Sequence, residues 1–520
     1  MSDPDKDKIP VSAADGAPGQ GILDHLPEQT YHPQPYETGD GDGAKKNNSD
    51  ILIVDWDGPD DPHNPLNWTY RRKWVATLII SAFTFISPVS SSMVAPATGQ
   101  VATAFGITNN VVLALTTSIF VLAYAVGPFF LGPLSEIYGR SRVLQLSNLW
   151  YIAWNAGCGF AQSEAQLLAF RFLAGLGGSA PLSIGGGFLG DCWRPEERGK
   201  AVSIYSLAPL LGPVVGPITG AWIAERSTWR WVFWSTSIAA SAIQLLGFVY
   251  LQETYPPLLL ERKAERIRKR MDTEKSTYKE IRTIFEGQNR SWQTVLGKSL
   301  SRPFALFACE PIIQLLGLYM AYLYGLLYIL LTTMTSIFQG VYQESVGISG
   351  LHYIALGLGL MIASQLNSNT MDRIFIYFKT RNGGVAKPEF RLPAMIPGSV
   401  ILPIGCLIVG WTTQAHTHWI APDIGIALVG AGIVLNFQCI QTYIVDCFTL
   451  HAASAMAAVS FLRSIAGFGF PLFAPSMYNA LGFGMGDTIL AIVAVVIGCP
   501  APYIFWRYGE RIRGVSRYAQ

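Results

Sequence analysis

The chain has 520 residues, half of them hydrophobic, and only 14% carry a charge, against roughly 25% in an average soluble domain. The formal net charge is +2, which excludes the strongly basic surface typical of nucleic-acid-binding proteins. A mean hydropathy of +0.31, with 51 glycines and 31 prolines set within apolar sequence, indicates a membrane protein with many spans.

Residues 1–70 are polar and rich in Asp, Gly and Pro, so we expect a disordered cytosolic N-terminal tail with a short ordered approach to the membrane at residues 64–68. A membrane-spanning helix needs about 20 mostly apolar residues. Twelve such runs follow the tail, six before and six after a charged stretch at residues 252–302. They lie near residues 74–95, 111–131, 143–162, 166–189, 201–224, 231–251, 311–337, 350–369, 393–412, 421–441, 454–477 and 487–507.

The predicted fold class is an all-α membrane protein with twelve transmembrane helices in two six-helix, pseudo-symmetric halves. The halves comprise residues 71–251 and 303–510, with residues 252–302 as a cytosolic central loop and residues 511–520 as a cytosolic tail. Of the 37 Lys and Arg residues, 33 lie on one side of the predicted spans and two on the other. Because basic loops stay in the cytosol, we expect a multi-pass protein of the cell membrane with both termini cytosolic.

A tight turn rich in glycine and charge separates the second and third runs. It reads GPLSEIYGRSR over residues 132–142, and its glycines allow close approach to neighbouring helices. Glu136 and Arg140 are spaced to pair with charged partners nearby. The turn resembles the signature loop of the major facilitator superfamily, with Glu136 where that family usually has Asp and Ser141 where it often has a basic residue.

The fourth run contains a charged residue, Arg171, with Gly175 and Ser179 one and two turns along the same face. An arginine inside a span costs about 2.5–3.5 kcal/mol on insertion scales, so we expect it to face a cavity or a polar partner. The segment resembles the fourth-span motif of the superfamily, with Ala174 in place of the usual Gln, and this resemblance implies a role in proton coupling. The alternative is that Arg171 snorkels to the membrane surface.

The fifth run reads APLLGPVVGPITG over residues 208–220. Small residues on one face let helices approach closely, and prolines remove backbone donors and bend the helix. The pattern resembles the antiporter motif of drug:proton exporters, which uptake symporters generally lack; ordinary helix packing is the alternative. The residues of this motif are Gly212, Pro213, Gly216, Pro217 and Gly220.

Further stretches narrow the resemblance to the twelve-span drug:proton antiporters of fungi, over residues 55–515. By that resemblance Glu136, Arg140 and Asp191 would form a cytosolic charge relay that locks or releases the two halves. Direct protonation of one of these acids is the second possibility. The stretches are NPLNW at 64–68, DCWR at 191–194, ETYPP at 253–257, PEFRLP at 388–393 and LRS at 462–464.

Polar residues inside apolar spans are the candidates for lining a substrate pocket. Each of them could equally form a hydrogen bond between helices. The first six spans contain no acid at depth, and Glu310, Asp446 and Asp487 lie only near the ends of later spans, so proton coupling rests on the resemblance. The substrate-binding candidates are Gln314, Tyr319, Tyr322, Asn367, Asn436, Gln438 and Arg463.

The leading predicted function is proton-coupled efflux of small organic molecules, such as drugs, toxins or secondary metabolites, by alternating access between two states. The expected partners are a small-molecule substrate, protons and the lipid bilayer. We expect a monomer with no enzymatic activity, no cofactor, no metal and no nucleic-acid partner. Two alternatives remain: a symporter or facilitator for an endogenous metabolite such as an organic acid or polyamine, and a non-transporting membrane receptor.

Overall fold

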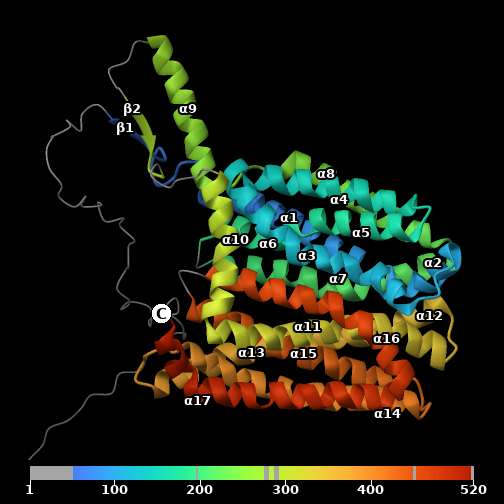
Figure 1. The fold of residues 1–520 in the computed structure, drawn as a ribbon. Helices are drawn as coiled ribbons and strands as arrows, with labels where there is room; N and C mark the ends of the chain where they lie inside the picture. Colours follow the sequence, from blue (N-terminus) through green and yellow to red (C-terminus); the bar gives the residue numbers. More distant parts are fainter. Residues whose placement is uncertain (1–50, 195–196, 275–279, 286–291, 449–451, 517–520) are drawn as a thin grey trace, which may run out of the picture. The chain divides into compact units, whose positions relative to one another are not determined.

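Nearly all of the described part of the chain is helical. The computed structural model describes residues 51–194, 197–274, 280–285, 292–448 and 452–516. Its long helices lie side by side and form a bundle (Figure 1). Helices are the expected solution for such apolar runs, because a chain in hydrocarbon must satisfy its backbone N–H and C=O groups internally.

The helices between residues 70 and 250 form the first half. α1 packs on α7, and α4 packs on both α5 and α8. α5 and α6 meet at Ser179 and together make one long segment. The helices of this half are α1 (Tyr70–Ser92), the short η3 (Ala95–Ala97), α2 (Thr98–Phe105), α3 (Asn110–Tyr138), α4 (Arg140–Gly159), α5 (Glu164–Gly178), α6 (Ala180–Cys192), α7 (Arg198–Arg226) and α8 (Trp229–Tyr250).

The helices from residue 311 onward form the second half, in which α11 packs on α16 and α14 packs on α15 and α16. α16 is broken at Gly482, whose backbone leaves the helical region with φ 77° and ψ 170°. The elements of this half are α11 (Pro311–Thr335), the π-helix η4 (Ser336–Val341), α12 (Val346–Leu351), α13 (Tyr353–Arg381), η5 (Pro388–Met395), α14 (Ile396–Gln414), α15 (Ile420–Cys447), α16 (Ala452–Gly498) and α17 (Pro500–Val515).

Ten segments of the described residues are long and apolar enough to cross a membrane, by length and composition. One of them, Ser454–Gly514, has 61 residues and contains the break at Gly482. The ten segments do not include α4, a helix of 20 residues. The helices cover the apolar runs expected from the sequence, and the count of twelve spans stays a prediction.

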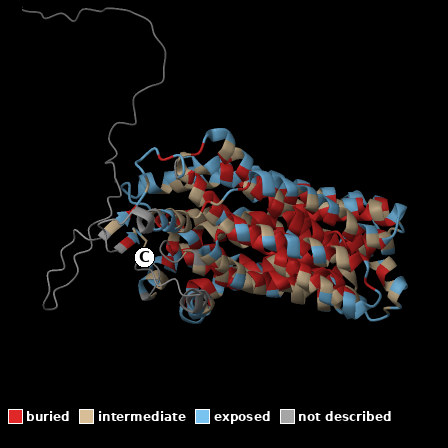
Figure 2. Ribbon diagram, turned by 90° about the horizontal axis from the view of Figure 1, so that it is seen from above, coloured by how far each residue is buried: buried red, intermediate tan, exposed pale blue. Residues whose placement is uncertain are grey.

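Burial divides the bundle into a packed interior and an apolar outer surface. Buried residues lie along the helix faces that point inward (Figure 2). Large apolar side chains remain exposed on the outside, among them Leu245, Val249, Ile362 and Val496, each more than half exposed. A continuous apolar exterior on helices of this length is what a lipid bilayer covers.

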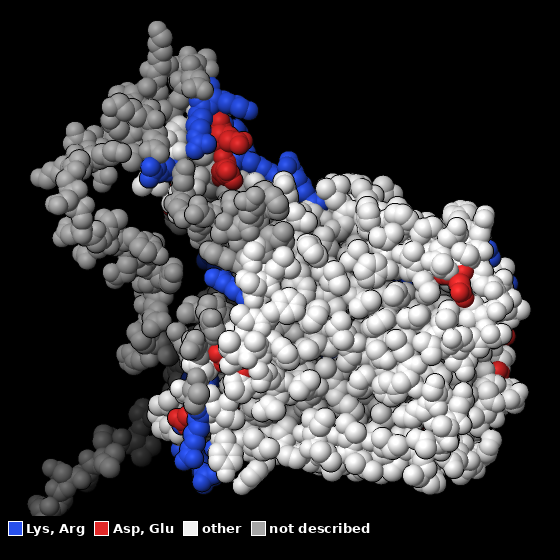
Figure 3. Space-filling model, in the orientation of Figure 1, with Lys and Arg blue, Asp and Glu red and all other residues white. Residues whose placement is uncertain are grey.

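Basic residues gather at one end of the bundle (Figure 3). We call this the basic end; Arg140 at the start of α4, Arg391 in η5 and Arg513 in the last turn of α17 belong to it. The opposite end carries α2 and α12 (Figure 1). Most of the broad face between the two ends is free of charge in the view of Figure 3.

Two segments expected to be a tail and a loop contain regular structure. β1 (Ile51–Val54) pairs in parallel with β2 (Glu280–Thr283). Val54, Ala264 and Ile281 form a small apolar core between this pair and α9 (Pro256–Glu274). The predicted tail of residues 1–70 therefore includes a strand and the short helix η2 (Pro65–Asn67), while residues 1–50 lie outside the described part. The central stretch ends in α10 (Trp292–Cys309).

The glycine face of α7 lies directly against α1. A Cβ atom added at Gly212 would come within 2.6 Å of Pro88, and one added at Gly216 within 2.6 Å of the Val89 carbonyl oxygen. At Gly220 it would collide with the carbonyl oxygen of Met93. Only residues without a side chain allow the two backbones to approach so closely.

The other side of α7 contacts the second half. Two glycines of that half provide the space that α7 occupies. A Cβ atom added at Gly350 of α12 would collide with Ala221, and one added at Gly357 of α13 would lie 2.7 Å from Val214. At the opposite end, Glu225 of α7 accepts a hydrogen bond from the backbone N–H of Gly347, the second residue of α12. α7 is thus packed between α1 and the second half.

We predict that Gly216→Ala destabilises the protein by about 1–3 kcal/mol, because its methyl group would overlap the Val89 carbonyl oxygen and the hydroxyl of Ser92. Thermal unfolding of the purified protein measures the loss. Gly186→Ala in α6 is the matched control, since its methyl group would meet no atom within 4 Å. Equal stability of the two variants would contradict the close packing of α1 and α7.

Candidate functional site

Arg171 of α5 is fully buried near the opposite end of the first half. Its guanidinium donates hydrogen bonds to four backbone carbonyl oxygens and lies 4.8 Å from the ring centre of Phe120. The acceptors are Ser90 (2.9 Å), Ser91 (3.0 Å), Thr116 (3.0 Å) and Thr117 (3.3 Å). The guanidinium is buried among helices and does not reach the surface of the protein, whereas a snorkelling arginine would extend to the membrane surface.

These contacts tie three helices together and reach the second half. Ser90 and Ser91 lie at the end of α1, and Thr116 and Thr117 lie in α3. The hydroxyl of Ser91 is 3.2 Å from the hydroxyl of Tyr328 in α11. Arg171 thereby holds the part of α1 that contacts α11, although none of its described hydrogen-bond partners is an acid.

A polar cluster that was not predicted from the sequence lies beside Arg171. Asn155 of α4 is fully buried; its amide nitrogen donates to Thr236, Ser237 and the Phe233 carbonyl oxygen at 2.9–3.0 Å. Its carbonyl oxygen accepts from the Ser90 hydroxyl at 3.0 Å. Asn155 is one of two asparagines in the apolar third run, which was the available signal, and its saturated hydrogen bonding indicates a structural role.

At the basic end of the first half, Arg140 forms an ion pair with Asp191, with Nε 2.5 Å from Oδ2. Glu253, after α8, accepts hydrogen bonds from the backbone N–H groups of Arg140, Thr254 and Tyr255 at 2.9–3.1 Å. Glu136 is exposed and has no described ion pair. Two of the three predicted relay residues, Arg140 and Asp191, therefore lie together in the structure. Glu253, which the sequence indicated only as part of the ETYPP stretch, joins them through the backbone of Arg140.

The second half repeats this arrangement. Arg391, just before α14, pairs with Asp446 at the end of α15 (2.7 Å) and with Asp372 in α13 (3.1 Å). Arg140 and Asp191 occupy the corresponding places in the first half, at the start of α4 and the end of α6. Each ion pair joins elements of one half only, so each stabilises its own half at the basic end.

Three of the predicted substrate-binding residues form hydrogen bonds within the second half. The side-chain nitrogen of Asn367 donates to Gln438 at 2.9 Å, and Gln438 donates to Ser364 at 2.7 Å. Asn436 is fully buried, accepts from Ser399 and donates to the Gly432 carbonyl oxygen. These contacts connect α13 with α15 and α14 with α15, and they satisfy the polar groups without a ligand.

Three further candidates also lie within the second half. Gln314 donates to the carbonyl oxygens of Phe307 and Ala308 and thereby caps the end of α10. Tyr322 donates to the carbonyl oxygen of Leu490 at 2.6 Å. Tyr319 is 1% exposed and packs next to Gly498.

Arg463 of α16 is different because it lies where the two halves meet. Its guanidinium is 5.2 Å from the ring centre of Tyr324 and 5.3 Å from that of Phe437. α16 packs against α3 of the first half, and a Cβ atom added at Gly467, one turn beyond Arg463, would lie 3.2 Å from Val121 of α3. Arg463 is half-buried, and its Nε has no hydrogen-bond partner among the described residues. A cation among aromatic rings, with a free donor, is able to bind an anionic or polar aromatic molecule.

A cavity of about 280 Å3 opens between the halves near the opposite end. Its lining is polar for an apolar bundle. The hydroxyl groups of Thr117 and Thr335 are buried and have no partner among the described residues, as expected if water fills the space. The residues that line it are Ala95, Thr98, Asn110, Leu113, Ala114, Thr117, Thr332, Thr333, Thr335, Ser336, Pro471, Ala474, Pro475, Tyr478, Asn479 and Phe483.

Both the sequence and the fold are similar to those of known proteins. A family model described as the Major Facilitator Superfamily matches residues 80–471. Efflux pump vrtL of Penicillium aethiopicum is 48% identical over 508 residues, which cover 98% of this chain and 98% of that protein. MFS-type transporter penM of Penicillium rubens is 43% identical over 484 residues, or 93% of this chain and 94% of that protein.

Among solved structures, a partially occluded inward open conformation of the xylose transporter XylE from E. coli is similar with a TM-score of 0.62. The two sequences are 15% identical over 84% of this chain and 98% of that chain. At this identity the likeness concerns the fold alone.

We predict that Asp191→Asn lowers the stability by about 1.5–3 kcal/mol, because the charge-assisted bond with Arg140 is lost. Glu136→Gln is the control and should change the stability by less than about 0.5 kcal/mol, as expected for an exposed side chain. Thermal unfolding in detergent measures both values. A larger loss in the Glu136 variant would restore Glu136 to the relay.

Arg171→Ala should also destabilise the protein, because it removes four buried hydrogen bonds of a charged donor, each of which contributes about 1.5–3 kcal/mol. The melting temperature and the yield of monodisperse protein report the effect. Arg226→Ala, at the exposed end of α7, provides the comparison. Unchanged melting of the Arg171 variant would show that these bonds contribute little.

Proposed function

Because the chain belongs to the Major Facilitator Superfamily, we propose that this small-molecule transporter works as a proton-coupled exporter of organic compounds. Its two halves would alternate between exposing a central site to the cytosol and to the outside. Export by antiport requires that substrate and proton bias the same two-state equilibrium.

The packing of α7 is the observation that carries the proposal. Its glycine face leaves no space towards α1, and its other side contacts α12 and α13 of the second half. A helix held this closely on both sides moves as a unit with α1, so a shift of α1 is passed to the contact between the halves. Pro213 and Pro217 are buried in the same stretch and lack the N–H groups that would stiffen it.

The names of the relatives support the outward direction. The relative from Penicillium aethiopicum is named an efflux pump and is similar along nearly the whole chain. The glycine and proline pattern of α7 resembles the antiporter motif of exporters. We propose the same orientation as in the sequence prediction, with the basic end in the cytosol and the opposite-end cavity towards the outside.

We propose Arg463 as the residue of the central site that contacts the substrate. It lies on α16, which packs against α3 of the first half, and its guanidinium lies near the aromatic rings of Tyr324 and Phe437. The remaining candidates have hydrogen-bond partners within the second half or, like Tyr319, pack in its interior. A guanidinium in such surroundings favours cargo that carries a carboxylate, a phenolate or another acceptor group.

The test measures transport in inside-out membrane vesicles from cells that produce the protein. A panel of small organic molecules is offered outside, and mass spectrometry follows their accumulation inside under an imposed pH gradient. We expect accumulation of a subset of compounds when the interior is acidic, and its loss when an uncoupler collapses the gradient. Accumulation that persists after collapse but requires ATP would reject the coupling, and accumulation only under the reversed gradient would indicate a symporter.

Variants of Arg463 serve as the matched pair in the same assay. Arg463→Gln removes the charge but keeps a polar side chain, and we expect it to lose transport of acidic compounds. Arg463→Lys retains the charge and should keep part of the transport of acidic compounds. Transport by Arg463→Gln at the level of the unchanged protein would remove this residue from the site.

A further inference from the structure

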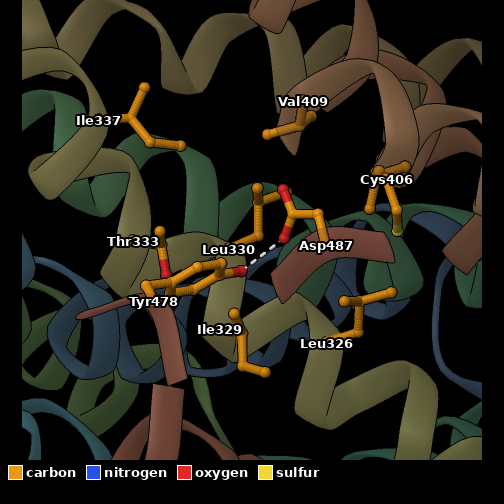
Figure 4. A pocket seen from close by; sticks show the side chains of 10 residues that line it. Leu326, Ile329, Leu330, Thr333, Ile337, Cys406, Val409, Tyr478 and Asp487 are labelled. Atoms are coloured by element: carbon orange, nitrogen blue, oxygen red, sulfur yellow. Dashed lines mark hydrogen bonds between the residues drawn. The ribbon is translucent and has the colours of Figure 1, made fainter. Parts of the chain in front are cut away.

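Asp487 is a buried acid that the sequence placed only at the start of the last span. It is 6% exposed and lies five residues beyond the helix break at Gly482, about 7 Å along the helix. Apolar side chains of α11 and α14 surround it, including Leu326, Leu330 and Val409 (Figure 4). Ionisable residues at such positions are costly and therefore mark functional sites.

The carboxylate of Asp487 has one described hydrogen bond, donated by the hydroxyl of Tyr478 at 2.6 Å (Figure 4). The other titratable groups that face it are Cys406 of α14 and Tyr322 of α11. Within the described residues no Lys, Arg or His interacts with it. It differs in this respect from Asp191, Asp446 and the other paired acids, because no cation compensates its charge.

A small cavity beside this carboxylate adjoins the larger cavity between the halves. Asp487 lines a cavity of about 20 Å3, which is room for about one water molecule. Thr333 and Tyr478 line both this cavity and the 280 Å3 cavity between the halves. Tyr478 thus stands between the buried acid and the larger, polar space near the opposite end.

We propose that the carboxyl group of Asp487 binds and releases the coupling proton, which reaches it from the opposite-end cavity past Tyr478. The inference rests on the proposed proton-coupled export. A proton from water in the cavity joins the carboxylate oxygen and neutralises it, and it leaves again to water when the site opens to the cytosolic side. The hydroxyl of Tyr478 is able to donate to the carboxylate and to accept from the protonated acid.

The proton then alters which state of the protein is favoured. An unpaired carboxylate is tolerated only next to water, because its burial among apolar groups costs several kcal/mol. The ionised form therefore stabilises the state in which the cavity beside Tyr478 is hydrated. Protonation removes that requirement and allows the halves to close over Asp487.

A second titratable cluster at the opposite end must be distinguished from this site. His352 lies 2.8 Å from Asp423 and 2.8 Å from Glu344, and its ring stacks on Phe338. Both acids of this cluster already face an imidazole. A pH response that originates there would not depend on Asp487.

The experiment follows closure of the cavity without any substrate. Ala114, which lines the cavity, is changed to Cys in a full-length protein that also carries Cys309→Ser and Cys499→Ser, which remove the two exposed native thiols. The protein is reconstituted in phosphatidylcholine liposomes and labelled with a membrane-impermeant maleimide over a range of pH. Ala415→Cys, in an exposed loop at the same end, corrects for the pH dependence of the thiol itself.

We expect the corrected labelling rate at Ala114→Cys to fall several-fold as the pH is lowered. Asp487→Asn, which mimics the protonated acid, should hold the rate at its low-pH value throughout. Persistence of the pH response in Asp487→Asn would overturn the assignment and point to the His352 cluster. Absence of a response in the parent protein would reject proton coupling itself, and with it this site.

Tyr478→Phe tests the same assignment if Asp487→Asn does not fold. Removing the hydroxyl takes away the hydrogen bond that stabilises the carboxylate. We therefore expect the midpoint of the labelling response to move to higher pH, with its amplitude retained. An unchanged midpoint would overturn the role of the pair.

Discussion

The need to satisfy buried charge inside an apolar bundle underlies most of what the structure shows. Arg171 is satisfied by four backbone carbonyl oxygens, and Arg140 and Arg391 by the carboxylates of Asp191 and Asp446. In each case the partners come from other helices, so each charge fixes the relative positions of the elements around it. Asp487 stands apart because a tyrosine hydroxyl is its described partner.

The contacts within each half differ from the contacts between the two halves. The ion pairs at the basic end each join elements of one half and leave the other half free. Contacts between the halves are of another kind: Gly350 of α12 and Gly357 of α13 pack closely on α7. The described hydrogen bonds across the halves include that between Ser91 and Tyr328 and that from Gly347 to Glu225. Two stable halves joined by such contacts would allow the proposed alternation between two states.

Much of the fold, and part of the site, could be predicted from the chain alone. The apolar runs are long enough to specify helices without tertiary help, and the glycine repeat in residues 208–220 does pack tightly, against α1. Arg171 was recognised because a charge in a span is conspicuous. Glu253, the pair of Arg391 with Asp446, and Asn155 were missed, because their partners lie far away in the sequence.

The sequence by itself determined which segments are helices, which end is basic and which residues are too polar for their surroundings. Only the tertiary structure decided which way each polar side chain points. The rotation of a helix about its axis decides whether a residue such as Asn367 faces the space between the halves or a neighbouring helix, where it donates to Gln438. The periodicity of one apolar run does not define how that helix is rotated relative to its neighbours. The packing of the helices sets this rotation, and it brings Arg463 of α16 beside α3 and Tyr478 into the lining of the cavity between the halves.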